Sequence, residues 1–139
     1  MRDSEILRIM ARKIFPFMLL FGFYLIAYGH ISPGGGFQGG VVLGSSVILL
    51  CLCYGLESVE KMLPGSGSGL AECLLMIALI AVGLLGIWAR GTFLGNIVWH
   101  EWDEPLPRAG TILMLDILIG LKVGAGMTAL FYHMARDER

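Results

Sequence analysis

The sequence holds a run of 43 residues, from position 14 to position 56, that has no lysine, arginine, aspartate or glutamate. A membrane-spanning helix needs about 20 apolar residues, so this run is long enough to cross a bilayer twice. Of all 139 residues, 56% are hydrophobic and 15% are charged, whereas a soluble domain has about 25% charged residues. We therefore expect an all-α integral membrane protein.

Four apolar segments predict four transmembrane helices within a single membrane domain, residues 1–139; their expected ranges are about 14–29, 37–56, 70–89 and 109–134. A short helix over about 4–12 is expected to lie on the membrane surface, because its apolar residues share one face. The first span resembles a signal peptide, but no small-residue cleavage site ends it and a second span follows directly. We expect it to be retained.

The predicted connections differ in composition and charge. Residues 64–69 alternate glycine with serine after a proline and are expected to form a flexible turn. Seven basic residues lie in segments on one side of the expected membrane, while the opposite connections hold only Arg90 and Arg108. The positive-inside rule then places both termini in the cytoplasm. A net charge of −1 argues against nucleic acid as a partner.

The connection between the first two spans is a glycine-rich break without formal charge. Pro33 lacks a backbone donor, and the glycines that follow it allow conformations that other residues avoid. Irregular backbone survives at membrane depth only inside protein or beside water. Two interpretations stay open: a tight turn at the membrane interface, or a structured element buried against a partner.

Glycines also recur at helical spacing inside the spans. Gly36, Gly40 and Gly44 are four residues apart in the second span, and Gly120 and Gly124 repeat this spacing in the fourth. Such faces let helix backbones approach closely in lipid. We expect them to mediate packing within the chain or with neighbours.

The glycine-rich break resembles the hallmark of the MnhB (MrpB) family, whose members are small membrane subunits of the multisubunit Mrp-type sodium/proton antiporters. The residues that carry the resemblance are Gly29, His30, Pro33, Gly34, Gly35, Gly36, Phe37, Gly39 and Gly40. Further matches are Arg12, Pro16, Gly110, Thr111, Leu115 and Asp116. The resemblance covers nearly the whole chain; Ile112 stands where the family often has proline.

The resemblance implies a non-catalytic subunit of a cation (Na⁺)/proton antiporter in a prokaryotic cell membrane, or of the homologous antiporter module of a redox-driven complex such as a membrane-bound hydrogenase. Its partners would be other membrane subunits, the lipid bilayer, and Na⁺ and H⁺ as transported ions, with no organic cofactor. One alternative is a self-sufficient homodimeric exporter, although such proteins carry an early membrane carboxylate and the apolar run here has none before Glu57. Another is a purely structural assembly subunit.

Two charged residues interrupt the fourth span, where a charge near the bilayer centre costs about 2.5–3.5 kcal/mol or more. Asp116 and Lys122 are separated by about 9 Å along a helix and about 120° around it, so each needs a partner elsewhere. Asp116 either bonds the polar end of a neighbouring helix or lines an ion path. Lys122 either anchors a subunit contact or lines the same path, and Glu72 is expected at the interface.

Other candidate chemistry is weaker. His30 either exchanges protons near neutral pH or holds the turn by hydrogen bonding. Cys51, Cys53 and Cys73 are expected to be small packing residues, without metal or disulfide roles. His100 and nearby carboxylates imitate a metal site, but zinc prefers more nitrogen or sulfur ligands. We expect a solvated acidic loop, no metal, and no enzyme.

Overall fold

The computed structural model describes residues 2–31, 34–63, 65–95 and 110–137. Their secondary structure is helical; the elements are α1 (Arg2–Tyr28), α2 (Gly35–Tyr54), α3 (Leu56–Glu60), α4 (Gly65–Arg90) and α5 (Gly110–Asp137). Four of them contain a segment long and apolar enough to cross a membrane, namely Glu5–Tyr28, Gly35–Tyr54, Gly69–Ala89 and Gly110–Asp137. The predicted all-α fold with four spans is confirmed.

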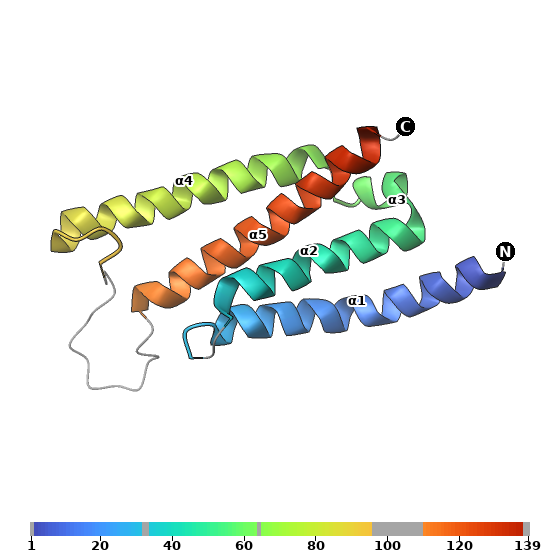
Figure 1. The fold of residues 1–139 in the computed structure, drawn as a ribbon, viewed down its shortest axis with the longest axis horizontal. Helices are drawn as coiled ribbons and strands as arrows, with labels where there is room; N and C mark the ends of the chain where they lie inside the picture. The colour runs from blue at the N-terminus through green and yellow to red at the C-terminus, as the bar shows by residue number, and fades with distance from the viewer. Residues whose placement is uncertain (1, 32–33, 64, 96–109, 138–139) are drawn as a thin grey trace.

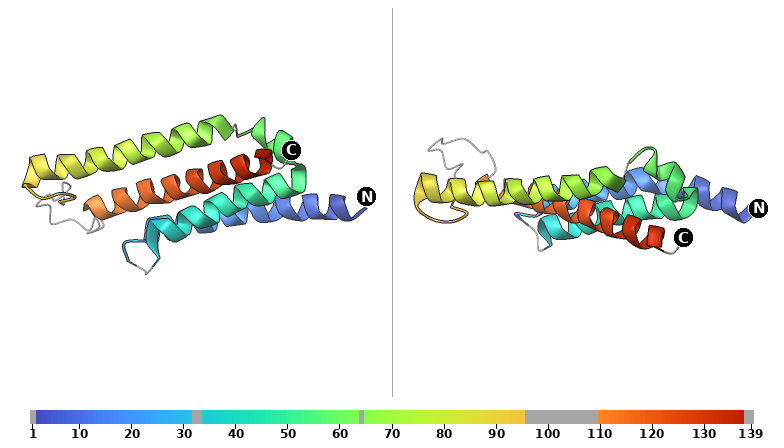
Figure 2. Two further views of the ribbon diagram at one scale, coloured as in Figure 1. Left: turned by 45° about the horizontal axis from the view of Figure 1, so that its top comes forward. Right: turned by 90° about the horizontal axis from the view of Figure 1, so that it is seen from above.

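The four long helices lie side by side in one layer, in the order α1, α2, α5, α4 (Figure 1). The layer is thin when it is seen from above (Figure 2). Because α2 is flanked by α1 and α5, 39% of its most apolar stretch is buried, compared with 17% for each of the other spans. A single layer cannot enclose its own apolar side chains, so lipid or other proteins must cover them.

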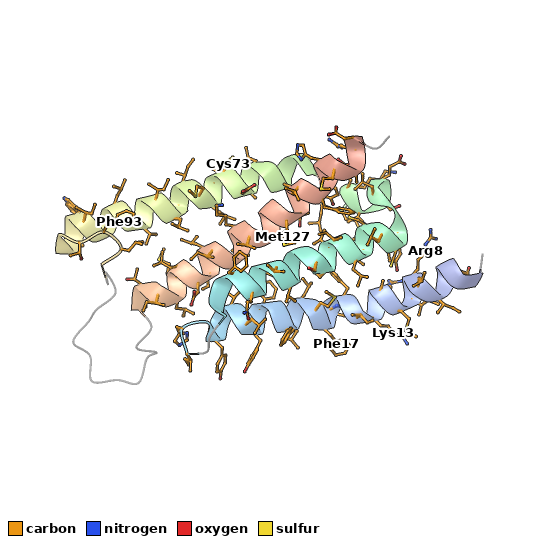
Figure 3. The ribbon with its side chains drawn as sticks, in the orientation of Figure 1. Arg8, Lys13, Phe17, Cys73, Phe93 and Met127 are labelled. Carbon is orange, nitrogen blue, oxygen red and sulfur yellow. The ribbon has the colours of Figure 1, made fainter. Side chains whose placement is uncertain are left out.

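Many large apolar side chains point away from the layer. Phe17, for example, lies on the outer side of α1 with 71% of its surface exposed, and Cys73 is exposed on α4 (Figure 3). The start of α1, the end of α5 and the short α3 share one end of the molecule (Figure 1). We call this the terminal end. The connection between α1 and α2 lies at the opposite end.

The structure has one continuous helix where the sequence indicates two. Instead of a separate surface helix over about 4–12, α1 runs without a break from Arg2 to Tyr28 and contains Pro16. The physical reason is that residues 2–13 include no glycine or proline to stop a helix. Continuing an existing helix also costs less than starting a new one.

The expected flexible turn over residues 64–69 is a second correction. α4 begins at Gly65, so the run of glycine and serine forms its first turns. The chain reverses earlier: α2 ends at Tyr54, Gly55 has a φ of 86°, and the short α3 follows. Gly55 supplies the left-handed conformation that other residues avoid. The glycine-serine composition of residues 65–69 is typical of a turn, and it therefore predicted the turn too late in the chain.

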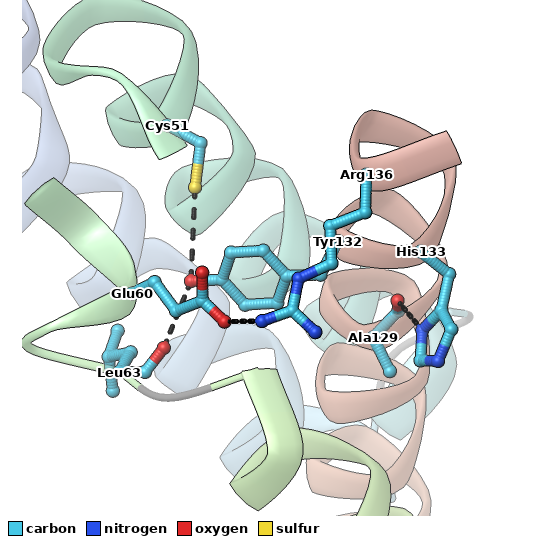
Figure 4. Close-up of polar contacts among 7 residues, drawn as sticks. All are labelled: Cys51, Glu60, Leu63, Ala129, Tyr132, His133 and Arg136. Atoms are coloured by element: carbon cyan, nitrogen blue, oxygen red, sulfur yellow. Dashed lines mark hydrogen bonds and ion pairs between the residues drawn. The ribbon is translucent and has the colours of Figure 1, made fainter. Parts of the chain in front are cut away.

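A small buried cluster closes the terminal end (Figure 4). The hydroxyl of Tyr132 donates a hydrogen bond to the Leu63 carbonyl oxygen over 3.1 Å and accepts one from the Cys51 thiol over 3.9 Å. Beside it, Arg136 of α5 forms an ion pair with Glu60 of α3. These contacts tie α2, α3 and α5 to the segment that leads into α4.

Candidate functional site

The glycines of α2 and α5 bring the two backbones into direct contact. A Cβ added to Gly40 would overlap the carbonyl oxygen of Gly120, and one added to Gly44 would lie 3.3 Å from the carbonyl oxygen of Gly124. Backbone atoms cannot move aside as a flexible side chain can. The structure therefore brings the two glycine series together as one helix–helix contact.

The opposite face of α2 is equally close to α1. A Cβ on Gly39 would lie 2.5 Å from Cγ1 of Ile26 and 2.7 Å from the carbonyl oxygen of Gly22. Sequence spacing alone does not identify Gly22, because it has no glycine four positions away in its own helix. α2 thus has glycines on both faces and is held between two backbones.

Asp116 reaches from α5 to the first turn of α2. The backbone N–H of Gly36 donates a hydrogen bond to Asp116 Oδ1 over 3.5 Å. A Cβ on Gly29 would lie 2.8 Å from Asp116 Oδ2, and one on Gly35 would lie 3.2 Å from Oδ1. The carboxylate occupies space that side chains at these glycines would fill, and the positive end of the α2 dipole favours its charge.

We name the residues Gly29, His30, Gly35, Gly36 and Asp116 the glycine corner. Backbone geometry explains two glycines at this corner or beside it: Gly34 has a φ of 128° and Gly35 a φ of 51°. Both values lie where side chains with a Cβ are strained. The described residues on both sides of the break therefore pack on Asp116 of α5 in the same chain, while residues 32 and 33, including Pro33, lie outside the described residues.

Two polar atoms at the glycine corner are buried without a hydrogen-bond partner in the described part of the chain: Asp116 Oδ2 and His30 Nδ1. His30 follows Gly29 directly and is half-buried. A buried polar atom without a partner costs about 1–3 kcal/mol. Phe37, which the sequence placed in the family motif, is not buried at this corner, because 61% of its surface is exposed. The two atoms therefore leave hydrogen-bonding capacity unused at the connection between α1 and α2, within the described residues.

Lys122 lies away from this corner and has a different partner. Its Nζ is 3.7 Å from Glu72 Oε1 of α4, which the sequence alone did not identify as a partner. A Cβ on Gly126 would lie 3.2 Å from the same Glu72 oxygen. Gly126 lies one helical turn after Lys122. A glycine at this spacing from a membrane lysine is the one feature of the sequence that could have indicated space for a partner side chain beside Lys122.

The described residues offer no cluster of three or more histidine, cysteine or carboxylate side chains for a metal ion. The acidic loop over residues 99–104, where His100 imitates a metal site, lies outside them. Cys51 is buried, Cys53 is half-buried and Cys73 is exposed; all three are free thiols.

Comparison with known proteins supports the resemblance seen in the sequence. A family model described as a domain related to the MnhB subunit of Na⁺/H⁺ antiporter matches residues 6–129. The chain is 39% identical over 80 residues to a Na⁺/H⁺ antiporter subunit of Bacillus subtilis, a match to 57% of this chain and 56% of that protein. An uncharacterized protein of Methanocaldococcus jannaschii is 31% identical over 97% of this chain and 53% of its own length.

A solved structure shares the fold over most of the chain. It is the membrane-bound sulfane sulfur reductase, an archaeal respiratory membrane complex, with a TM-score of 0.76 and 31% identity. The match covers 93% of this chain and 56% of the chain in that complex. The present chain therefore spans about half the length of the relatives it matches.

Proposed function

Because the chain belongs to the MnhB family of antiporter-subunit domains, we propose that it is a membrane subunit of a multisubunit Na⁺/H⁺ antiporter or of the antiporter module of a respiratory complex. Its partners are other membrane subunits, and the transported ions of the assembly are Na⁺ and H⁺. The one-layer fold supports this role, since a single layer leaves both of its faces to be covered (Figure 2).

The observation that supports a role for Asp116 in the ion path is its oxygen Oδ2, which has no partner among the described residues. One oxygen of this carboxylate contacts the start of α2, while the other is buried without a partner in the described structure. Ionisable groups at membrane depth commonly mark ion pathways. Asp116 and His30 line the ion route at the glycine corner, where Asp116 Oδ2 meets a proton or a sodium ion.

The orientation follows from charge. The start of α1, the short α3 and the end of α5 lie at the terminal end of the layer (Figure 1). The basic residues of these segments are Arg8, Arg12 and Lys13 in the first half of α1, Lys61 directly after α3 and Arg136 in the last turn of α5. The positive-inside rule assigns this end to the cytoplasm. Both termini are then cytoplasmic, and the glycine corner lies toward the outer surface.

The test is Asp116→Asn, which keeps an oxygen that can accept the Gly36 N–H but removes the charge. We expect the complex to assemble normally and Na⁺-driven proton exchange in membrane vesicles to fall roughly tenfold or more, since contacts to charged groups are worth about 1.5–3 kcal/mol. Asp137→Asn, at the exposed end of the same helix, is the matched control and should leave exchange unchanged.

Two results would contradict the proposal for Asp116. Normal exchange by the Asn variant would show that its charge does not take part in transport. Loss of assembly by the same variant, detected on native gels, would reduce Asp116 to a structural contact at the start of α2.

A further inference from the structure

The Lys122–Glu72 pair joins a lysine deep in α5 to a glutamate three residues into the apolar stretch of α4 (Gly69–Ala89), and the pair is incompletely satisfied. Lys122 lies 12 residues from the start of α5 and 15 from its end, about 18 and 22 Å at helical rise. The separation of 3.7 Å exceeds a hydrogen bond, and 30% of the Lys122 side chain and 39% of the Glu72 side chain are exposed. Lipid tails offer no hydrogen bonds, so a further polar component has to reach the pair.

The start of α4 leaves an open approach to this pair. Its first five residues are glycines and serines (residues 65–69). Gly69 lies one turn before Glu72 on the same side of the helix, and a Cβ added there would meet nothing within 4 Å. Glu72 is seven residues from the start of α4, a distance of about 10 Å. Small residues therefore lead from the helix start toward the charge pair, and the position one turn before Glu72 is open.

We propose that the start of α4 forms one wall of an aqueous entrance, through which water and small hydrated cations reach Lys122 and Glu72 from the terminal end. The opposite wall comes from a neighbouring subunit, because α4 lies at the edge of the layer (Figure 1). The assignment of this entrance to ion transport rests on the proposed function. Water access itself does not depend on that assignment.

The test is thiol labelling in membrane vesicles that contain the assembled complex. The native cysteines are first replaced (Cys51→Ser, Cys53→Ala, Cys73→Ala), and Gly69→Cys is compared with Leu70→Cys. Leu70 is 65% exposed at nearly the same depth, but it points away from Glu72 because the two are two positions apart on the helix. The probe is a charged methanethiosulfonate that cannot cross membranes, added to either side in separate experiments.

We expect the cysteine at position 69 to react on the order of tenfold faster than the one at position 70, because thiolates form in water and not in lipid. The reaction should require reagent on the side of the terminal end. Equal, slow labelling at both positions would overturn the entrance, as would labelling of position 69 only from the opposite side. If Gly69→Cys prevents assembly, Glu72→Cys combined with Lys122→Gln replaces it, with the same expected result.

These results are separable from the fate of the proposed function. Labelling reports water access whether or not the vesicles exchange ions. Fast labelling without transport would leave the entrance standing and contradict its assignment to an antiporter. Transport without labelling of position 69 would leave the proposed function standing and contradict the entrance.

Discussion

At the scale of single residues, the central feature is backbone contact through missing side chains. A Cβ on Gly40 would lie 2.4 Å from the carbonyl oxygen of Gly120, and a Cβ on Gly39 would be as close to Ile26 and Gly22 on the other side. Close approach of this kind replaces the hydrophobic drive that is missing between helices in lipid. The glycines therefore determine the distances between α1, α2 and α5.

Gly40→Ala should prevent normal packing of α2 on α5. The added methyl group meets backbone, so the helices must separate, and overpacking of this kind typically costs about 1–3 kcal/mol. We expect less assembled protein in membranes, measured on native gels. Gly69→Ala is the matched control, since its Cβ enters open space and alanine favours a helix by about 0.5–1 kcal/mol over glycine. Equal assembly of the two variants would contradict this account.

The sequence predicts such residues when a short-range pattern exposes them. The series that contains Gly36, Gly40 and Gly44 is visible from its spacing, and the structure places it against α5. The pairing of Lys122 with Glu72 joins residues 50 positions apart in two helices. No local pattern encodes which rotation of α4 brings them together, so only the structure could identify the pair.

At the scale of elements, α4 depends on α5 for its place in the layer. It packs mainly on α5, and Glu72 meets both Lys122 and the surface left open by Gly126. An ion pair at one point along two apolar helices can specify their register, which is a well-supported role for such groups.

Reversing one charge of the pair should loosen α4, and reversing both should restore it. Lys122→Glu places two carboxylates together and is expected to lower stability by about 1–3 kcal/mol, because one charged group loses its partner. The double variant Lys122→Glu with Glu72→Lys should regain assembly. Reversal of Arg136 and Glu60 is the control, since exposed pairs are worth about 1 kcal/mol or less. No rescue in the double variant would rule out a direct role for the pair.

Tyr132→Phe should weaken the terminal end without changing the fold. The variant loses the hydrogen bond to the Leu63 carbonyl and the contact with the Cys51 thiol. Net losses of about 1 kcal/mol are typical, so a protein with Cys51 as its sole thiol should label roughly fivefold faster. Tyr54→Phe removes a hydroxyl that donates to the Arg8 carbonyl at an exposed site and should have a smaller effect. Unchanged labelling would contradict a closing role for Tyr132.

Helix existence was predictable, but some helix ends were not. Four apolar runs of spanning length indicate four helices, and the structure has them. The start of α4 within a glycine-serine run goes against the low helix propensity of glycine, so propensity alone does not place it. The continuity of α1 follows from the lower cost of extending an existing helix, which the separate apolar pattern of residues 4–12 does not reveal. The short α3 depends on the contact of Leu56 and Val59 with Tyr132.

At the scale of the whole molecule, the main feature is a single layer of helices that does not enclose its own apolar side chains (Figure 2). All four long helices carry large exposed apolar side chains, and Asp116, Lys122 and Glu72 lie within the spans. Length and hydropathy predict a membrane protein but not a layer, because the way helices are arranged depends on contacts between distant residues. A layer whose polar groups need covering is the form expected of a subunit, and it is unsuited to a protein that works alone.

The most direct test of this central claim is native mass spectrometry of the tagged chain, purified gently from its own membranes together with whatever it binds. The account predicts assemblies in which this 15.1 kDa chain is accompanied by several larger hydrophobic subunits. Masses that are only multiples of this chain, together with ion exchange by that species alone in proteoliposomes, would contradict it.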